Sequence, residues 1–335
     1  NTEEQISDFG IKKSNVKLIP QDTVLMSFKL TIGRLTISKC PLYTNEAIVS
    51  FIPKTPNSVD TDYLYYGLQS WNLLGEVDQA VKGATLNKDK LSRIFGLFPP
   101  LPEQKKIASI LTSVDEVIEN TQKQIDKLQD LKKATMNELL TKGIGHTEFK
   151  KSELGQIPKS WEVVELGDTG KWKGGGTPSK SNAEFWEGKI PWVSPKDMKH
   201  DYISKTQDYI SEIAVKNSSV NLIDEGAILI VVRSSILKHT LPVAISECSL
   251  TVNQDMKALS VNKHFCNLFI YHYLIANNHK VLRSTLKAGN TVESIDTKVF
   301  SEYLIPAPPV IEQVTIAKGV ESVASQIIDK KHQLQ

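Results

Sequence analysis

Side chains that could hold a phosphate gather in the stretch 171–180, which reads Lys-Trp-Lys-Gly-Gly-Gly-Thr-Pro-Ser-Lys. Glycines let the backbone N–H groups approach an anion closely, while lysines add charge and hydroxyls add hydrogen-bond donors. The alternative is an ordinary solvated turn. A Walker phosphate loop is excluded, because Gly175-Gly176 stands where that loop requires Gly-Lys-Ser/Thr. The candidate contacts from this stretch are Lys173, Gly174, Gly175, Gly176, Thr177, Ser179 and Lys180.

Basic and amide side chains follow several of the expected strands. Arg233 comes directly after an apolar run, where an arginine can reach a guanine edge or a phosphate, with a surface ion pair as the alternative. Asn253, Gln254 and Asn45 could pair with adenine, with capping amides as the alternative. The further candidates for contact with a nucleic acid are Lys196, Ser234, Ser235, Lys238, Lys287 and Asn290, and in the first part of the chain Lys29, Arg34, Lys82 and Thr85.

Composition narrows the class of protein. The chain has 335 residues, enough for two domains, and its 40% hydrophobic content indicates a globular fold. No apolar run reaches the length of a membrane span, so we expect a soluble protein without a membrane partner. Three scattered cysteines, Cys40, Cys248 and Cys266, indicate neither a metal site nor disulfides and favour the cytoplasm. A net charge of +2 neither requires nor excludes a nucleic-acid partner.

A long helix is expected between the two groups of candidate residues. Residues 99–142 show a continuous helical pattern after Pro99-Pro100. Apolar residues recur at alternating steps of four and three, which is the spacing of a coiled-coil seam. Gly143 and Gly145 are expected to end the helix, which would be about 60 Å long at ~1.5 Å per residue. The expected seam residues of this helix are Ile107, Leu111, Val114, Ile118, Ile125 and Leu128.

The same pattern returns near the carboxyl terminus. Glu103-Gln104 and Glu312-Gln313 are similar at an offset of 209 residues, by 312 − 103, and each pair follows two prolines. Ser14–Ile19 also resembles Ser218–Ile223 at an offset of 204, by 218 − 14. These matches indicate an internal repeat. The expected seam of the second helix is Ile316, Val320, Val323 and Ile327.

The repeat divides the sequence into four parts. We expect a first globular domain over 1–98, a spacer helix over 99–142, a second globular domain over 143–305 and a second helix over 306–335. Relative to the second copy, the first domain lacks its beginning and the second helix lacks its end. Two similar helices can bury their seams against each other, so the predicted fold class is α+β: two mixed α/β domains separated by an antiparallel coiled coil, with pseudo-two-fold symmetry.

Within the two domains, period-two and apolar runs predict short elements. Strands are expected at 16–18, 24–28, 48–52 and 94–98, and in the second domain at 161–166, 190–193 and 228–233. Helices are expected at 63–74 and 268–274, and loops at 82–85 and 171–180.

Several motifs resemble one known family at its usual spacing. These are Ile157-Pro158 with Trp161–Asp168, Gly175–Ser179, Ile190–Asp197, and the Pro-Leu-Pro-Glu-Gln start of the helix at residues 100–104. The sequence is similar to the specificity subunits of type I restriction–modification systems, which carry target recognition domains. The resemblance covers the whole chain.

The resemblance implies a non-catalytic DNA-binding subunit that reads a bipartite, asymmetric target in double-stranded DNA. It further implies two methyltransferase subunits as partners, which would carry S-adenosylmethionine for DNA methylation, and restriction subunits with motor activity. No cofactor and no metal is expected on this chain itself. If the shortened ends are natural, a dimer of two copies would restore the pair of half-sites.

Two other classes of protein compete with this interpretation. A stand-alone adenine-N6 DNA methyltransferase or a nuclease fragment could carry a similar recognition domain. A methyltransferase requires an Asn/Asp-Pro-Pro-aromatic motif, and neither Pro99-Pro100 nor Pro308-Pro309 lies in one. A coiled-coil scaffold without a DNA role would leave the glycine-rich stretch and the duplication unexplained.

Overall fold

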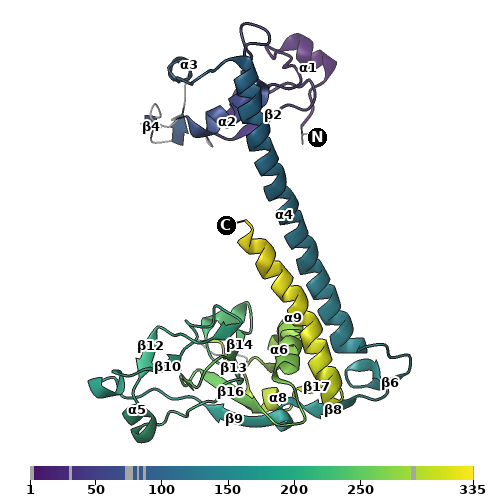
Figure 1. Cartoon of the computed structure of the whole chain (residues 1–335), viewed down its shortest axis with the longest axis vertical. Helices are drawn as coiled ribbons and strands as arrows, with labels where there is room; N and C mark the ends of the chain where they lie inside the picture. The colour runs from purple at the N-terminus through teal and green to yellow at the C-terminus, as the bar shows by residue number, and fades with distance from the viewer. Residues whose placement is uncertain are drawn as a thin grey trace. The chain divides into compact units, whose positions relative to one another are not determined.

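The computed structural model describes residues 4–29, 32–71, 78–80, 83–85, 88–287 and 292–334. It divides the chain into two compact units, residues 1–122 and 123–335. Figure 1 labels their helices and strands. The division falls inside one long helix, α4 (Leu101–Lys142).

The first unit is a small three-stranded antiparallel sheet in the order β2-β1-β3, covered by a helix. Its strands are β1 (Val24–Ser27), β2 (Leu35–Ile37) and β3 (Ile48–Phe51), and its helices are α1 (Asp8–Lys13), α2 (Thr61–Ser70) and α3 (Lys88–Leu91). A hairpin of β4 (Asp78–Ala80) and β5 (Gly83–Thr85) completes the described part. Val24 and Met26 on β1 pack against Leu64 and Leu68 on α2. The Asp60 side chain caps α2 by accepting from the N–H of Tyr63.

Helix α4 begins where the prolines predict. The carbonyl of Pro100 accepts from the N–H groups of Glu103 and Gln104, which closes the first turn. Gln104 is buried and bonds three backbone groups: it accepts from the N–H of Asp60 at 2.9 Å and donates to the carbonyls of Ser58 at 3.4 Å and Pro99 at 2.7 Å. A side-chain amide thus fixes the beginning of α4 to the loop before α2.

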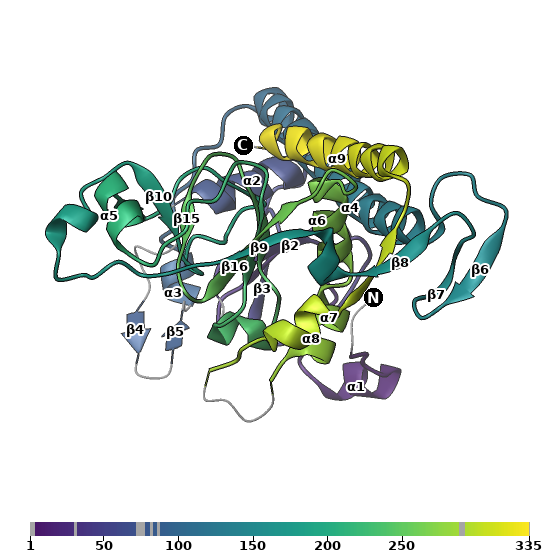
Figure 2. The same ribbon diagram turned by 90° about the horizontal axis from the view of Figure 1, so that it is seen from below.

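In the second unit, Gly143 and Gly145 follow the end of α4, and both have left-handed backbone conformations, with φ of 68° and 69°. The hairpin of β6 (Phe149–Ser152) and β7 (Gly155–Pro158) follows and projects from the rest of this unit (Figure 2). A two-stranded sheet joins β8 (Glu162–Glu165) to β17 (Leu304–Ala307). A three-stranded sheet has the order β12-β10-β15, with β10 (Ile190–Val193), β12 (Asp208–Ile210) and β15 (Thr251–Val252).

A five-stranded sheet in the order β11-β14-β13-β16-β9 forms the centre of the second unit. Its strands are β11 (Tyr202–Ile203), β14 (Val243–Ser246), β13 (Ile228–Val231), β16 (Met256–Val261) and β9 (Gly170–Gly174). All four residues of β13 are buried, as expected for an Ile-Leu-Ile-Val run at the middle of a sheet. The helices of this unit are α5 (Glu212–Asn217), α6 (Asn267–Ala276), α7 (Asn278–Thr285), α8 (Thr297–Ser301) and α9 (Val310–His332). Short 3-10 helices lie at η1 (Leu166–Thr169), η2 (Ala183–Phe185) and η3 (Ser235–Lys238).

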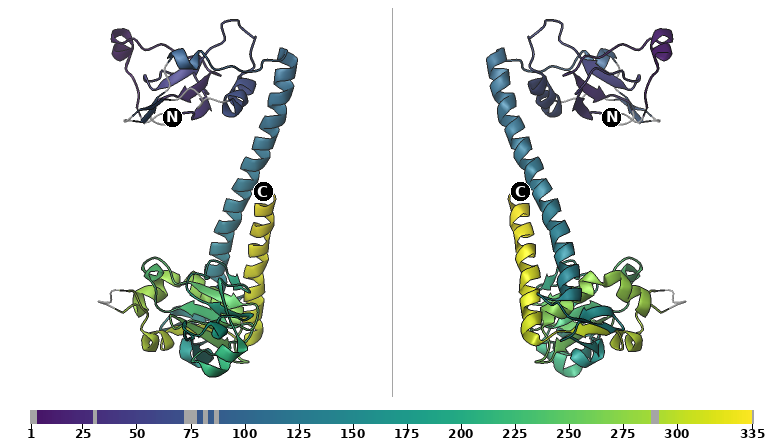
Figure 3. Two further views of the ribbon diagram at one scale, coloured as in Figure 1. Left: turned by 90° about the vertical axis from the view of Figure 1, so that its left-hand side faces the viewer. Right: turned by 90° about the vertical axis from the view of Figure 1, so that its right-hand side faces the viewer.

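Helix α9 lies antiparallel beside the carboxyl-terminal half of α4 (Figures 1 and 3). Met136 and Leu140 of α4 share one core with Ile316 and Val320 of α9. A partly buried polar network joins α9 to α6 and to the central sheet: His272 Nε2 of α6 lies 2.7 Å from Glu321 Oε1, and the Tyr202 hydroxyl of β11 donates to Glu321 Oε2 at 3.0 Å. The second unit therefore holds α9 by both apolar packing and charge-assisted hydrogen bonds.

Four local expectations are wrong. Residues 16–18 and 94–98 form no strand, because no described segment pairs with them beyond an isolated bridge between Ile19 and Leu42. Residues 171–174 belong to β9 rather than to a loop, since they pair with β16. Residues 83–85 form β5 instead of a loop. In each case the presence or absence of a pairing strand decides the outcome. None of the described helices has the length and apolar character needed to cross a membrane.

Candidate functional site

One end of the five-stranded sheet collects most of the predicted contacts of the second unit. Strands β13 and β9 end there, and β14 and β16 begin there, because each neighbouring pair is antiparallel. The strands β10 and β15 of the other sheet end nearby, since the N–H of Asn253 donates to the carbonyl of Val193 at 2.9 Å. The segments 174–177, 194–197, 233–238 and 253–255 follow or precede these strand ends, and we call them together the sheet-end cluster.

Backbone hydrogen bonds tie the segments of this cluster to each other. The N–H groups of Val232 and Arg233 both donate to the carbonyl of Asp255, at 2.8 and 3.1 Å. Ser234 N–H donates to the carbonyl of Glu293 at 3.0 Å, and Arg233 forms an isolated bridge with Ser294. The loop after β13 is therefore fixed between the turn before β16 and residues 293–294.

The basic side chains of the cluster differ in how they are engaged. Arg233 is exposed, and its guanidinium has no hydrogen bond or ion pair among the described residues. Lys238 Nζ lies 3.4 Å from Glu293 Oε1, so part of its charge is neutralised. Glu293 Oε2 is buried, and no described group bonds it. Lys287 is exposed and lies beside the cluster, because its backbone N–H donates to the carbonyl of Ser294, which bridges to Arg233.

The glycines of the 171–180 stretch serve close packing. A Cβ on Gly175 would lie 1.9 Å from the carbonyl oxygen of Asn253, a distance that only glycine avoids. The N–H of Gly176 donates to the carbonyl of Val252 at 3.0 Å, and the carbonyl of Gly176 accepts from Trp192 Nε1 at 2.9 Å. The segment is thus clamped onto the end of β15, and at Gly176 the backbone N–H is already bonded inside the protein.

The two neighbouring amides of the cluster have different surroundings. Asn253 is buried: its Oδ1 accepts from the N–H of Asp255 at 3.1 Å and its Nδ2 donates to the Asp255 carboxylate at 3.4 Å. Asn253 is therefore a capping amide, which was the alternative to pairing with adenine. Gln254 is exposed, and its Oε1 accepts a hydrogen bond from the Thr177 hydroxyl. Only Gln254 of this pair presents an amide to solvent.

The remaining predicted contacts of the second unit differ in exposure and in hydrogen bonding. Lys173 Nζ donates to the carbonyl of Leu222 at 2.8 Å, and Gly174 lies within β9 opposite Lys257. Ser179 bonds the Ser181 hydroxyl at 2.7 Å, while Lys180 is exposed. Lys196 is exposed in the turn after β10, and Ser235 begins η3. Asn290 lies outside the described residues.

In the first unit, three predicted contacts meet at the corresponding end of the small sheet. Lys29 follows β1, and Arg34 precedes β2 in the hairpin closed by the N–H of Ser27 donating to the Arg34 carbonyl at 3.0 Å. Asn45 precedes β3, and its Oδ1 accepts from the N–H of Ala47 at 3.0 Å, which makes it a turn-forming amide. Thr85 lies in β5, and Lys82 falls outside the described residues.

Two acidic residues, Asp255 in the cluster and Glu293 beside it, were missed in the sequence. An Asn-x-Asp turn signal at 253–255 could have indicated Asp255, because an asparagine commonly bonds the backbone two residues ahead. Nothing around Glu293 in the sequence links it to Lys238, which lies 55 positions earlier by 293 − 238.

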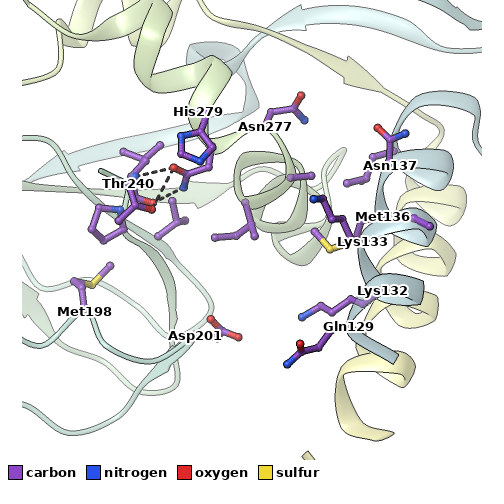
Figure 4. A pocket seen from close by; sticks show the side chains of 18 of the residues that line it. Gln129, Lys132, Lys133, Met136, Asn137, Met198, Asp201, Thr240, Asn277 and His279 are labelled. Atoms are coloured by element: carbon purple, nitrogen blue, oxygen red, sulfur yellow. Dashed lines mark hydrogen bonds between the residues drawn. The ribbon is translucent and has the colours of Figure 1, made fainter. Parts of the chain in front are cut away.

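A separate groove of about 1040 Å³ lies between the carboxyl-terminal half of α4 and the loops at 198–201, 236–243 and 275–279. Figure 4 shows Lys132, Lys133 and Met136 of α4 on one side and Met198, Asp201 and Thr240 on the other. Asn278 links two of these loops, because its Oδ1 accepts from the N–H of Leu241 at 2.8 Å. The groove mixes apolar walls with both signs of charge, so it does not single out one class of ligand.

Comparison with known proteins identifies the fold and its relatives. The sequence model of a family described as type I restriction modification DNA specificity domain matches residues 1–130 and 158–335. The specificity subunit of the type I restriction enzyme EcoR124I/EcoR124II from Escherichia coli is 44% identical over 171 residues, 51% of this chain and 41% of that protein. The putative MjaX specificity subunit from Methanocaldococcus jannaschii is 32% identical over 284 residues, 82% of this chain and 64% of that protein.

Solved structures show the same fold. The HsdS subunit from Thermoanaerobacter tengcongensis aligns with a TM-score of 0.53 over 95% of this chain and 77% of that one, at 16% identity. A type I restriction–modification S subunit from M. genitalium aligns with a TM-score of 0.60 over 95% and 80%, also at 16% identity. The chain spans less than two thirds of the length of the two curated relatives above.

Proposed function

Because the chain belongs to the family of type I restriction–modification DNA specificity domains, we propose that it is a sequence-recognition subunit of such a system. The observation that carries the proposal is the sheet-end cluster, which presents Arg233, Gln254 and Lys196 on one exposed end of the second unit. Arginine and glutamine are side chains that read base edges in the major groove, and lysine contacts phosphates. The subunit acts in the cytoplasm, contributes recognition rather than catalysis, and needs no cofactor of its own.

We infer further that the chain contains an internal repeat and reads a bipartite target in double-stranded DNA. Matching contacts in the two units support the repeat. Gln104 and Gln313 are both buried, and Gln313 accepts from the N–H of Cys266 at 2.8 Å and donates to the carbonyls of His264 at 3.2 Å and Pro308 at 2.8 Å. The strand order β2-β1-β3 also matches β14-β13-β16. Each unit would then read one half-site, with α4 and α9 as an antiparallel coiled-coil spacer.

We also propose that protein partners cover part of α4. Large apolar side chains on its amino-terminal half are exposed: Ile110, Leu111, Val114, Val117 and Ile118 have relative exposures of 56%, 37%, 50%, 64% and 49%. Such a stripe is typical of an interaction surface. The partners would be two methyltransferase subunits, which carry S-adenosylmethionine, joined by restriction subunits. A helix of a second copy of this chain is another occupant that would bury the stripe.

The test is selection from random duplex DNA by this chain reconstituted with its methyltransferase subunit. We expect enrichment of one split motif at both low and high salt, since base contacts keep their discrimination when phosphate contacts weaken. Arg233→Ala should weaken binding to that motif, whereas Lys330→Ala on the far end of α9 should not. Enrichment of no motif at any salt concentration would reject the proposal. Methyl transfer by the purified chain alone would instead favour the methyltransferase alternative.

A further inference from the structure

We propose that Gln254 reads an adenine in the half-site of the second unit and that Thr177 is the positioning residue that orients its amide. The inference rests on the proposed function and makes it specific to one base pair. Its basis is the hydrogen bond from the Thr177 hydroxyl to Gln254 Oε1, at an exposed position of the sheet-end cluster.

Gln254 is available for this role, whereas its neighbour is not. Both polar ends of the Asn253 amide are bonded to Asp255, and the residue is 6% exposed. Reading a base with Asn253 would break those bonds and leave the N–H of Asp255 without its acceptor. Gln254 Nε2 has no hydrogen-bond partner in the described part of the chain, and Oε1 keeps a second lone pair beside the bond from Thr177.

The segments that carry the two residues are held rigidly against each other. Thr177 directly follows Gly176, which is bonded on both sides, by its N–H to Val252 and by its carbonyl to the indole of Trp192. Gln254 follows Asn253, whose carbonyl oxygen touches Gly175 so closely that a Cβ there would overlap with it. Because both backbones are fixed, the hydroxyl can restrict the rotamers of the glutamine before DNA arrives, which lowers the entropy lost on binding.

The charge around Gln254 favours a base edge over a phosphate. The Asp255 carboxylate adjoins it in the chain, and Asp255 is only partly buried. A carboxylate at this place repels a phosphate but tolerates the amino group of a base. Adenine offers an N6 amino donor and an N7 acceptor, which match the oxygen and the nitrogen of one glutamine amide.

The test compares Gln254→Ala, Thr177→Val and Thr177→Ser in the reconstituted complex, by selection from random duplex DNA. Gln254→Ala should reduce the preference for adenine at one position of one half-site by roughly tenfold to a hundredfold. Thr177→Val should reduce the preference at the same position, because the isosteric valine lacks the hydroxyl, and Thr177→Ser should retain most of it. Gln207→Ala and Thr315→Val, which are exposed residues outside the cluster, are the matched controls and should leave the motif unchanged.

The double variant separates positioning from an independent contact. Thr177→Val combined with Gln254→Ala should discriminate no worse than Gln254→Ala alone, since the hydroxyl acts through the amide. The inference is overturned if Gln254→Ala weakens all positions equally, if the affected base is not adenine, or if Thr177→Val alters a different position. Thermal unfolding of every variant checks that the fold is retained. Failure of the unmodified complex to enrich a motif would instead reject the proposed function itself.

Discussion

At the scale of single residues, Glu293 is the unexpected group in a surface that we propose contacts DNA. Its carboxylate lies 3.4 Å from Lys238 Nζ and withholds that lysine from a phosphate. Glu293→Gln should therefore free Lys238, tighten binding to a nonspecific duplex, and steepen the dependence of log K on log salt by up to about one. Titrations of DNA binding between low and moderate salt measure this slope.

The control for this prediction is Glu302→Gln, which removes an exposed carboxylate paired with Lys298 on α8, away from the cluster. It makes the same change in net charge at a site without a proposed DNA contact. If both variants change the slope equally, Glu293 has no particular relation to the bound phosphates. A shallower slope in Glu293→Gln would mean that the ion pair holds Lys238 in place for a contact.

Residue types in the sequence suggested candidate contacts but could not rank them. Asn253 and Gln254 both carry a side-chain amide, so the sequence alone does not distinguish them. The turn before β16 makes Asn253 a buried cap and leaves Gln254 exposed. The glycines at 175 and 176 were predicted for phosphate contact, whereas the structure gives them a packing role that depends on the position of β15. Such distinctions depend on segments about 80 residues apart, as 254 − 177 = 77 shows for Gln254 and Thr177.

At the scale of elements, a buried glutamine fixes the beginning of each long helix. Gln313→Met should lower the free energy of unfolding by about 2 kcal/mol, because it leaves the buried Pro308 carbonyl and the partly buried Cys266 N–H and His264 carbonyl without their partner. Gln104→Met should have a similar effect on the first unit. Denaturant unfolding checks both values, with Gln333→Met at the exposed end of α9 as the control. If neither variant lowers the free energy of unfolding by more than Gln333→Met does, Gln104 and Gln313 do not anchor the helices.

The link between α6 and α9 should make stability depend on pH. The hydrogen bond and charge of His272, helped by Tyr202, outweigh burial and lower the pKa of Glu321 from its ordinary value of 4.5. A lowered folded-state pKa means that this stabilisation is complete above pH 4.5 and is lost as the pH falls through the folded value. Glu321→Gln should therefore be less stable than the native chain at pH 7, by about 2 kcal/mol, and this difference should shrink at acid pH. Melting curves from pH 7 to pH 3 measure it, and a difference independent of pH would contradict the assignment.

Helices were the elements that the sequence predicted most accurately. Pro99-Pro100 and Gly143 bracket α4 within two residues, because the backbone preferences of proline and glycine mark those ends. The strands at 24–28, 48–52 and 228–233 were found for the same local reason. The strand expected at 94–98 does not form, because no described strand pairs with it. Residues 304–307 do form a strand, since β8 supplies the pairing partner.

At the scale of the whole molecule, composition said little about partners, because a net charge of +2 neither requires nor excludes a nucleic acid. The sequence predicts a repeat at an offset of about 209 residues, and two proline-led helices do begin at Leu101 and Val310. The side-chain contacts of Gln104 and Gln313 give that offset a physical basis, since the same amide bonds the same three kinds of backbone group in each unit.

If α4 sets the spacing between two half-sites, its length should determine the gap in the recognised DNA. Inserting seven helical residues after Gln122 adds about 10 Å, which corresponds to about three base pairs at ~3.4 Å each. Seven residues are nearly two full turns, so the buried face of α4 should keep its direction. Selection from random duplex DNA should then return both original half-sites with a longer gap, whereas replacing seven exposed residues without insertion should leave the gap unchanged. A new half-site sequence at the old spacing would show that α4 does not set the distance.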